Sequence, residues 1–84
     1  MEIHYFAAAR AARGRTQETL PETGSTLGQL LDLLGGLHTG TAAGMTLAEV
    51  FTRCTFLIDG RAARPADSLS GATRVDVLPP FAGG

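Results

Sequence analysis

The sequence predicts a small α+β domain in which a mixed β-sheet is crossed on one face by one main helix. Three observations lead to this fold class. Residues near both ends of the chain, 2–6 and 73–78, are rich in β-favouring types. A leucine stripe at helical spacing runs from residue 27 to residue 34. A further β-favouring run, 54–58, leads directly into an Asp-Gly pair, which is the strongest short signal for a hairpin turn.

The composition is that of one globular domain. The chain has 84 residues, of which 44% are hydrophobic and 18% charged, and this is too apolar for intrinsic disorder. No apolar run approaches the roughly 18 residues of a membrane span and no signal peptide is visible, so we expect a cytoplasmic protein that has no membrane partner. Seven arginines and eight acidic residues give a formal net charge of -1 without a basic cluster, which argues against nucleic acid as a partner.

The cysteine count excludes an internal disulfide and a thiolate metal site, because Cys54 is the single cysteine of the chain. Its neighbours are apolar or β-favouring, and we therefore expect a buried, inert thiol. His4 and His38 belong to no recognisable motif with a carboxylate or serine, so neither is assigned a catalytic role and no metal site is expected.

The first two strands form a hairpin in this prediction. Residues 2–6 alternate, with Ile3 and Tyr5 on one side and His4 and Phe6 on the other. The alanine-rich residues 7–15 then make a connection with at most a helical turn, and a second strand follows and ends at residue 20.

The main helix starts after Thr26, because Thr26 and Gln29 match a capping box. Leucines at the spacing i, i+3, i+4, i+7 form one apolar stripe that should lie across the sheet, and Gly35 and Gly36 are expected to stop the helix. Residues 37–44 are interpreted as a flexible loop. Thr46 and Glu49 repeat the capping signature and predict a short second helix.

The remaining strands follow the second helix. A strand at 54–58 turns at Asp59 and Gly60 into a short edge strand at 61–64. In the final strand, 73–78, Val75 and Val77 should face inward while Arg74 and Asp76 alternate outward. This order permits a sheet with the first and last strands side by side in its middle, which is the β-grasp arrangement.

Beyond this domain, residues 1–78, the sequence predicts an extended tail, residues 79–84. Its two prolines lack donors and favour extended backbone, so they hold the chain end away from the sheet. The tail can span about 20 Å at roughly 3.3–3.6 Å per residue. Its two terminal glycines have no Cβ and can lie in a channel too narrow for other residues, so the terminal carboxylate can reach another protein's active site. The tail residues are Pro79, Pro80, Phe81, Ala82, Gly83 and Gly84.

The whole chain resembles the MoaD/ThiS family of ubiquitin-like sulfur carriers, and it is most similar to the small subunit of molybdopterin synthase. The resemblance implies that an E1-like enzyme adenylates Gly84 with ATP, that a sulfur donor system converts it to a thiocarboxylate, and that the tail enters the large synthase subunit. It also implies no bound cofactor, only covalent sulfur at Gly84. The resemblance is carried by Tyr5-Phe6-Ala7 through Arg10, the helix at 26–34, Ile58-Asp59-Gly60 and, most specifically, residues 77–84.

The chemistry agrees with this scheme. A terminal carboxyl has an unperturbed pKa of about 3.3–3.7, so near neutrality it is an anion and a poor electrophile that must be activated. Gly84 is therefore expected to be a modified co-substrate and not a catalytic residue. For partner recognition we expect Phe81 to be an aromatic anchor, with an apolar contribution from Phe56 or Leu57, although a strand phenylalanine is more often a core residue. Arginines at the surface can meet acidic groups of a partner; these are Arg61, Arg64 and Arg74.

Three alternatives remain open at this point. The same thiocarboxylate chemistry can serve thiamine thiazole or cysteine synthesis. The protein can instead be a ubiquitin-like modifier that forms an amide with target lysines, or an interaction domain with an inert tail. The chain has no lysine, since all seven of its basic residues are arginine, and so it cannot build isopeptide chains on itself through a side chain.

Overall fold

The structure is a computed structural model that describes residues 1–21 and 25–80. In that part of the chain the order of elements is β1 (Glu2–Tyr5), α1 (Ala7–Arg13), β2 (Gln17–Thr19), α2 (Leu27–Leu37), β3 (Thr41–Ala42), β4 (Met45–Thr46), α3 (Leu47–Phe51), β5 (Thr55–Ile58), β6 (Arg61–Ala63) and β7 (Arg74–Leu78). Among these residues, no helix has both the length and the apolar character needed to cross a membrane.

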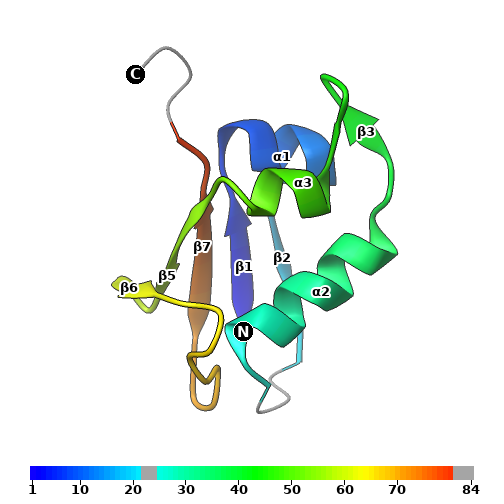
Figure 1. Ribbon diagram of the computed structural model, residues 1–84. Helices are drawn as coiled ribbons and strands as arrows, with labels where there is room; N and C mark the ends of the chain where they lie inside the picture. Colours follow the sequence, from blue (N-terminus) through cyan, green and yellow to red (C-terminus); the bar gives the residue numbers. More distant parts are fainter. Residues whose placement is uncertain (22–24, 81–84) are drawn as a thin grey trace.

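Five strands form one mixed sheet in the order β2-β1-β7-β5-β6 (Figure 1). The first and last strands pair in parallel in its middle, with Tyr5 opposite Val77, and the other neighbours are antiparallel. β3 and β4 form a separate two-stranded sheet. The predicted α+β class and the ubiquitin-like β-grasp arrangement are therefore confirmed.

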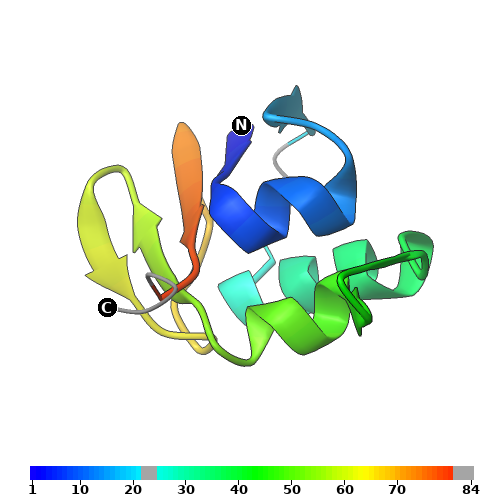
Figure 2. The same ribbon diagram turned by 90° about the horizontal axis from the view of Figure 1, so that it is seen from above.

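The three helices cover one face of this sheet (Figure 2). Alternate residues of the two central strands point toward them, and Ile3, Val75 and Val77 are completely buried. The helices supply the other half of the core from Ala9, Leu27, Leu30, Leu34, Leu47, Val50 and Phe51. Among the described residues, no helix lies on the opposite face of the sheet, and below we call this the open face.

The segment after β1 differs from its prediction, because it contains the helix α1 and not merely a turn. Its alanines have high helix propensity, and Ala9 is fully buried in the core. Gly14 adopts φ 78° and its N–H donates to the Arg10 carbonyl oxygen, so this glycine is the cap of a helix. The predicted antiparallel pairing of the first two strands is confirmed, with Ile3 opposite Glu18.

The capping box of α2 is confirmed, but the predicted end of this helix is wrong. Gln29 N donates to Thr26 Oγ1 at 3.2 Å, and Thr26 N donates to Gln29 Oε1 at 2.9 Å. The helix continues through both glycines to Leu37. Gly35 is buried against Ala48 of α3, where a Cβ would lie 3.0 Å from the Ala48 Cβ. The glycine therefore permits a close helix contact and does not terminate the helix.

The segment predicted as a flexible loop contains the β3–β4 hairpin. Its turn residues Ala43 and Gly44 have φ 53° and 79°, as the favoured two-residue hairpin turn requires. The short helix α3 that follows is confirmed with its capping box, since Glu49 N donates to Thr46 Oγ1 at 3.2 Å and Thr46 N to Glu49 Oε1 at 3.1 Å.

The Asp59-Gly60 turn and the edge position of β6 are confirmed, with φ 49° and 82° at the two turn residues. The inward orientation of the two valines of β7 is also confirmed. Asp76 lies on the outward side together with Arg74, as predicted, although it is only 9% exposed. Arg74, on the same side of the strand, donates from Nε to Asp76 Oδ1 at 2.7 Å and so provides the nearly buried carboxylate with a hydrogen-bond partner.

Candidate functional site

The root of the tail is the end of the central strand β7 (Figure 1). Leu78 pairs with Thr55 of β5, whose Oγ1 donates to the Leu78 carbonyl oxygen at 3.3 Å. Leu78 and Pro79 are half-buried and Pro80 is exposed. The chain is thus held firmly by the sheet up to Leu78 and reaches the surface at Pro80. The other four predicted tail residues lie outside the described part of the chain; they are Phe81, Ala82, Gly83 and Gly84.

An apolar patch adjoins this root on the open face. We call it the tail-root patch, and it consists of Phe6, Leu57 and Leu78. Phe6 follows Tyr5 with an extended backbone, φ -123° and ψ 151°, so its side chain lies on the opposite side of the sheet from that of Tyr5. It is 40% exposed, and Leu57 and Leu78 are half-buried. An exposed aromatic beside partly exposed leucines is typical of an interaction surface.

A band of charged side chains continues the open face from this patch. His4 Nε2 lies 2.8 Å from Glu2 Oε1, and the Arg74 to Asp76 ion pair lies beside it on β7. The parallel register places Glu2 opposite Arg74 and His4 opposite Asp76. An acidic residue of one central strand therefore lies opposite a basic residue of the other. This arrangement favours a partner with matching polar groups.

A buried ionic cluster fixes the helix that starts directly after Phe6. Arg13, the last residue of α1, donates from Nε to Glu18 Oε2 at 2.7 Å and from Nη2 to Glu18 Oε1 at 3.0 Å, while the Tyr5 hydroxyl donates to Glu18 Oε2 at 2.6 Å. The hydrogen bonds from Arg13 hold the pKa of Glu18 below its usual range. Burial raises the pKa of Tyr5, and Glu18 raises it further, so Tyr5 stays protonated. The cluster ties α1 to β2 and so supports the backbone that carries Phe6.

The sequence-predicted partner residues are distributed over different surfaces. Phe56 is 7% exposed and packs edge-to-face on Phe51, so its ring belongs to the core side of the sheet. Leu57 and Arg74 lie on the open face. Arg61 is exposed on the edge strand β6, and its pairing with Ile58 places it on the helix side. The segment after β6 carries the exposed Arg64.

Sequence reasoning missed Phe6 as a candidate contact. The available signal was the alternation that puts Phe6 on the side opposite the buried Ile3 and Tyr5. What the sequence could not supply is the pairing of β1 with β7, which brings Phe6 beside the root of a tail more than 70 positions away.

The environment of Cys54 is less enclosed than predicted. The residue is half-buried, and its Sγ donates to the Val50 carbonyl oxygen at 3.2 Å. Burial raises the pKa of Cys54 to about 11, so the group is a protonated thiol near neutrality. Within the described residues, no group of three potential metal-ligating side chains is found.

The fold and the strand that leads into the tail define a ubiquitin-like β-grasp protein. A family model described as the ThiS family matches residues 3–84, which is nearly the whole sequence including the last glycine. The chain therefore belongs to the ThiS family and has the fold of MoaD/ThiS-like sulfur carriers and modifiers.

Solved structures from two archaea share this fold. SAMP1 from Haloferax volcanii is 22% identical, with 99% of this chain and 97% of that chain covered and a TM-score of 0.70. A second structure, of H. volcanii small archaeal modifier protein 1, is 22% identical over 95% of each chain with a TM-score of 0.62. A putative molybdopterin converting factor, subunit 1, from Pyrococcus furiosus is 20% identical over 95% of each chain with a TM-score of 0.63. The sequence matches no curated protein.

Proposed function

We propose that this protein is a sulfur carrier whose Gly84 is converted to a thiocarboxylate, and that it donates this sulfur in molybdopterin biosynthesis as the small subunit of molybdopterin synthase. The observation that carries the proposal is the family match, which extends through Gly84. The fold adds support, because the central strand β7 leads straight into Pro79 and Pro80 with an apolar patch beside it.

The proposed reaction requires two steps at the Gly84 carboxyl group. The carboxylate attacks the α-phosphate of ATP, which releases pyrophosphate and leaves an acyl adenylate with AMP as the leaving group. A sulfide equivalent from the donor system then attacks the carbonyl carbon, AMP departs, and the thiocarboxylate remains. The charge stabilisation for both steps comes from the partners, because the tail itself offers neither an acid nor a base. Gly84 is in this scheme the co-substrate.

The proposed partners are an E1-like adenylating enzyme and the large synthase subunit, together with a sulfur donor system. The tail-root patch is the surface that suits them, since it adjoins the segment that must enter their active sites. Buried aromatic anchors commonly dominate such interfaces; Phe6 adjoins the tail root, and Phe81 follows Pro80 in the sequence. Arg74 offers a charged contact on the same face.

The test is intact-mass analysis of the protein isolated from its native host or produced together with its activating enzyme. We expect a species in which one oxygen is replaced by sulfur, located at Gly84 by fragmentation. A variant that lacks Gly84 is the control and should fold normally without acquiring sulfur. Complete absence of the sulfur-bearing species while the enzyme consumes ATP would refute the proposal.

A modifier function is the second candidate, and the likeness to small archaeal modifier protein 1 favours it. In that case the Gly84 carboxyl would form an amide with a lysine of a target protein. The same mass analysis distinguishes the two, since conjugates appear as high-mass species ending in a Gly-Gly branch. Because this chain contains no lysine, its side chains cannot extend such a conjugate into a polymer.

Thiazole or cysteine synthesis is the alternative use of the same thiocarboxylate. Supplying the sulfur-loaded protein with a cyclic pyranopterin precursor and the large synthase subunit decides between these acceptors. Formation of the dithiolene product supports the molybdopterin role, while a loaded carrier that leaves the precursor unchanged supports another acceptor.

A further inference from the structure

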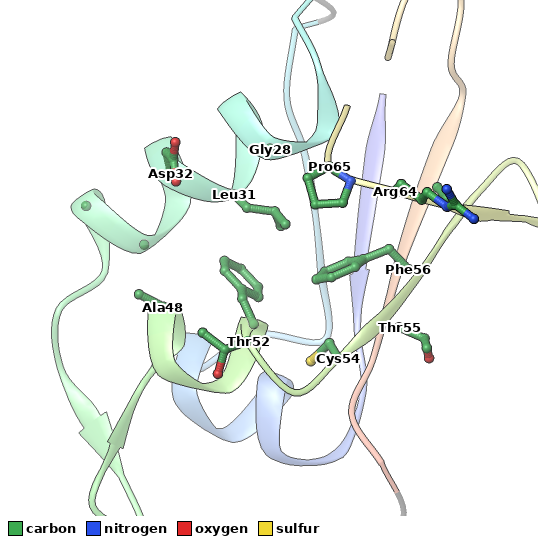
Figure 3. A pocket seen from close by; sticks show the side chains of 14 residues that line it. Gly28, Leu31, Asp32, Ala48, Thr52, Cys54, Thr55, Phe56, Arg64 and Pro65 are labelled. Carbon is green, nitrogen blue, oxygen red and sulfur yellow. The ribbon is translucent and has the colours of Figure 1, made fainter. Parts of the chain in front are cut away.

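An apolar groove lies on the helix side of the molecule and has no part in the function proposed above (Figure 3). Its volume is about 700 Å³, and it is bounded by α2, α3, β5 and the segment after β6. The edge-to-face pair Phe51 and Phe56, with ring centroids 6.1 Å apart, forms its floor. Leu31, Cys54 and Pro65 also line it. The groove therefore offers an aromatic and aliphatic surface to an apolar group.

Two close contacts of α2 lie along the groove. A Cβ at Gly28 would lie 3.1 Å from the Pro65 carbonyl oxygen, and a Cβ at Gly35 would lie 3.0 Å from the Ala48 Cβ. These contacts are seven residues apart, which corresponds to about 10 Å along a helix. The space along this stretch is long enough for a large apolar side chain.

The groove begins next to the root of the tail. Thr55 and Cys54 border the groove, and Thr55 is the residue that pairs with Leu78. Phe81 follows Leu78 by three positions in the chain, a reach of about 10 Å when extended. Phe81 itself lies outside the described residues; the length of chain between Leu78 and Phe81 is enough to reach the border of the groove.

We propose that in the free protein this groove receives the ring of Phe81 from the same chain. Aromatic rings favour edge-to-face and offset contacts with other rings, and the pair on the floor provides such a surface. The short tether raises the effective concentration of the ring at the groove, so that even a weak contact is populated. A partner that takes the tail must then displace Phe81 first; this consequence, though not the docking, rests on the proposed function.

Cys54 provides a direct reporter, because its thiol lines the groove. We expect a Phe81→Ala variant of the full chain to react faster than the wild-type protein with a neutral disulfide reagent such as dithiodipyridine. If the ring occupies the groove for nine-tenths of the time, the increase is about 10-fold, since the rate follows the open fraction. Phe6→Ala is the matched control, because Phe6 lies beside the end of β7 but on the open face, away from the groove. The Cys54 rate of this variant should equal that of the wild-type protein.

A second variant tests the site itself. Gly36 lines the groove, and a Cβ there meets no atom within 4 Å, so Gly36→Leu adds an apolar side chain at the groove without a steric clash. In this background the Phe81→Ala substitution should no longer change the Cys54 rate. In ¹H–¹⁵N spectra, Phe81→Ala should shift the amide signals of Leu31, Ala48 and Phe51.

Equal Cys54 rates in the wild-type and Phe81→Ala proteins, or amide shifts confined to the open face, would overturn the docking proposal. Such a result would leave the proposal of sulfur loading at Gly84 intact. Conversely, a protein with a docked Phe81 that acquires no sulfur would refute the carrier function and leave the docking proposal intact. The two proposals therefore fail separately.

Discussion

The adjacent glycines of α2 provide a sharp test of how the contact between α2 and α3 is built. Gly35 and Gly36 occupy the same helix one residue apart, so replacing either by alanine yields a similar gain in helix propensity of about 0.5–1 kcal/mol. Their surroundings differ. A Cβ at Gly36 meets no atom within 4 Å, whereas a Cβ at Gly35 lies 3.0 Å from the Ala48 Cβ and 3.4 Å from the Ala48 Cα.

The expected magnitudes follow from this difference. Two carbon atoms prefer a separation of about 3.5–4.0 Å, so Gly35→Ala creates an overlap that α3 must relieve by moving. Overpacking of this kind costs about 1–3 kcal/mol. Gly36→Ala should therefore raise the free energy of unfolding by about 0.5–1 kcal/mol, and Gly35→Ala should lie about 1–3 kcal/mol below it.

Urea denaturation followed by circular dichroism measures both variants, and thermal unfolding gives a second reading. In an 84-residue domain a change of 1 kcal/mol shifts Tm by about 4–8 °C, so the two variants should be clearly separated. An Ala48→Gly background removes the opposing Cβ, and the penalty of Gly35→Ala should largely disappear there. Equal stabilisation by both alanines, or a penalty that persists in the Ala48→Gly background, would refute the reasoning.

Three other predictions concern the tail-root patch, the ionic cluster and the thiol. Phe6→Ala should slow sulfur loading by the activating enzyme about 10-fold while the fold is kept, as expected for an aromatic interface anchor. The matched control Leu33→Ala alters a 56% exposed leucine on α2 and should load normally. Equal loading rates of the two variants would contradict the role assigned to Phe6. Because the folded-state pKa of Glu18 is lowered, its ion pair stabilises the protein above the unfolded pKa of about 4.3 and this stabilisation is lost as pH falls through the folded pKa. The stability difference between wild type and Arg13→Gln, measured by urea titration, should accordingly shrink below about pH 4.3, and a constant difference down to low pH is the opposing result. The rate of Cys54 alkylation by iodoacetamide should be low at neutral pH and rise steeply up to about pH 11. A rate that already reaches its plateau near neutral pH would contradict the burial argument.

Much of the fold could be predicted because its signals are local. The capping boxes at Thr26 and Thr46 each depend on a side chain three residues away, and the Asp59-Gly60 turn depends on two adjacent residues that tolerate positive φ. The alternation along β7 separates Val75 and Val77 from the open face by the geometry of a strand alone. The extended tail at residues 79–84 stays a prediction, which rests on local composition in the same way.

Features that depend on distant partners could not be predicted in this way. A glycine pair looks like a helix stop until Ala48 of another helix packs against Gly35, and an alanine-rich segment becomes a helix because Ala9 finds a place in the core. The tail-root patch exists only because β1 pairs with β7, which places Phe6 next to Leu78. The groove between α2 and β5 is likewise made by residues from four separate segments.

The sequence by itself thus determined where most strands and helices start and that Asp59 and Gly60 turn the chain. The tertiary structure alone decided which surfaces adjoin the end of β7. The physical reason is that caps, turns and alternation are settled among residues a few positions apart, whereas a patch or groove is defined by burial and by pairing between segments that the sequence keeps far apart.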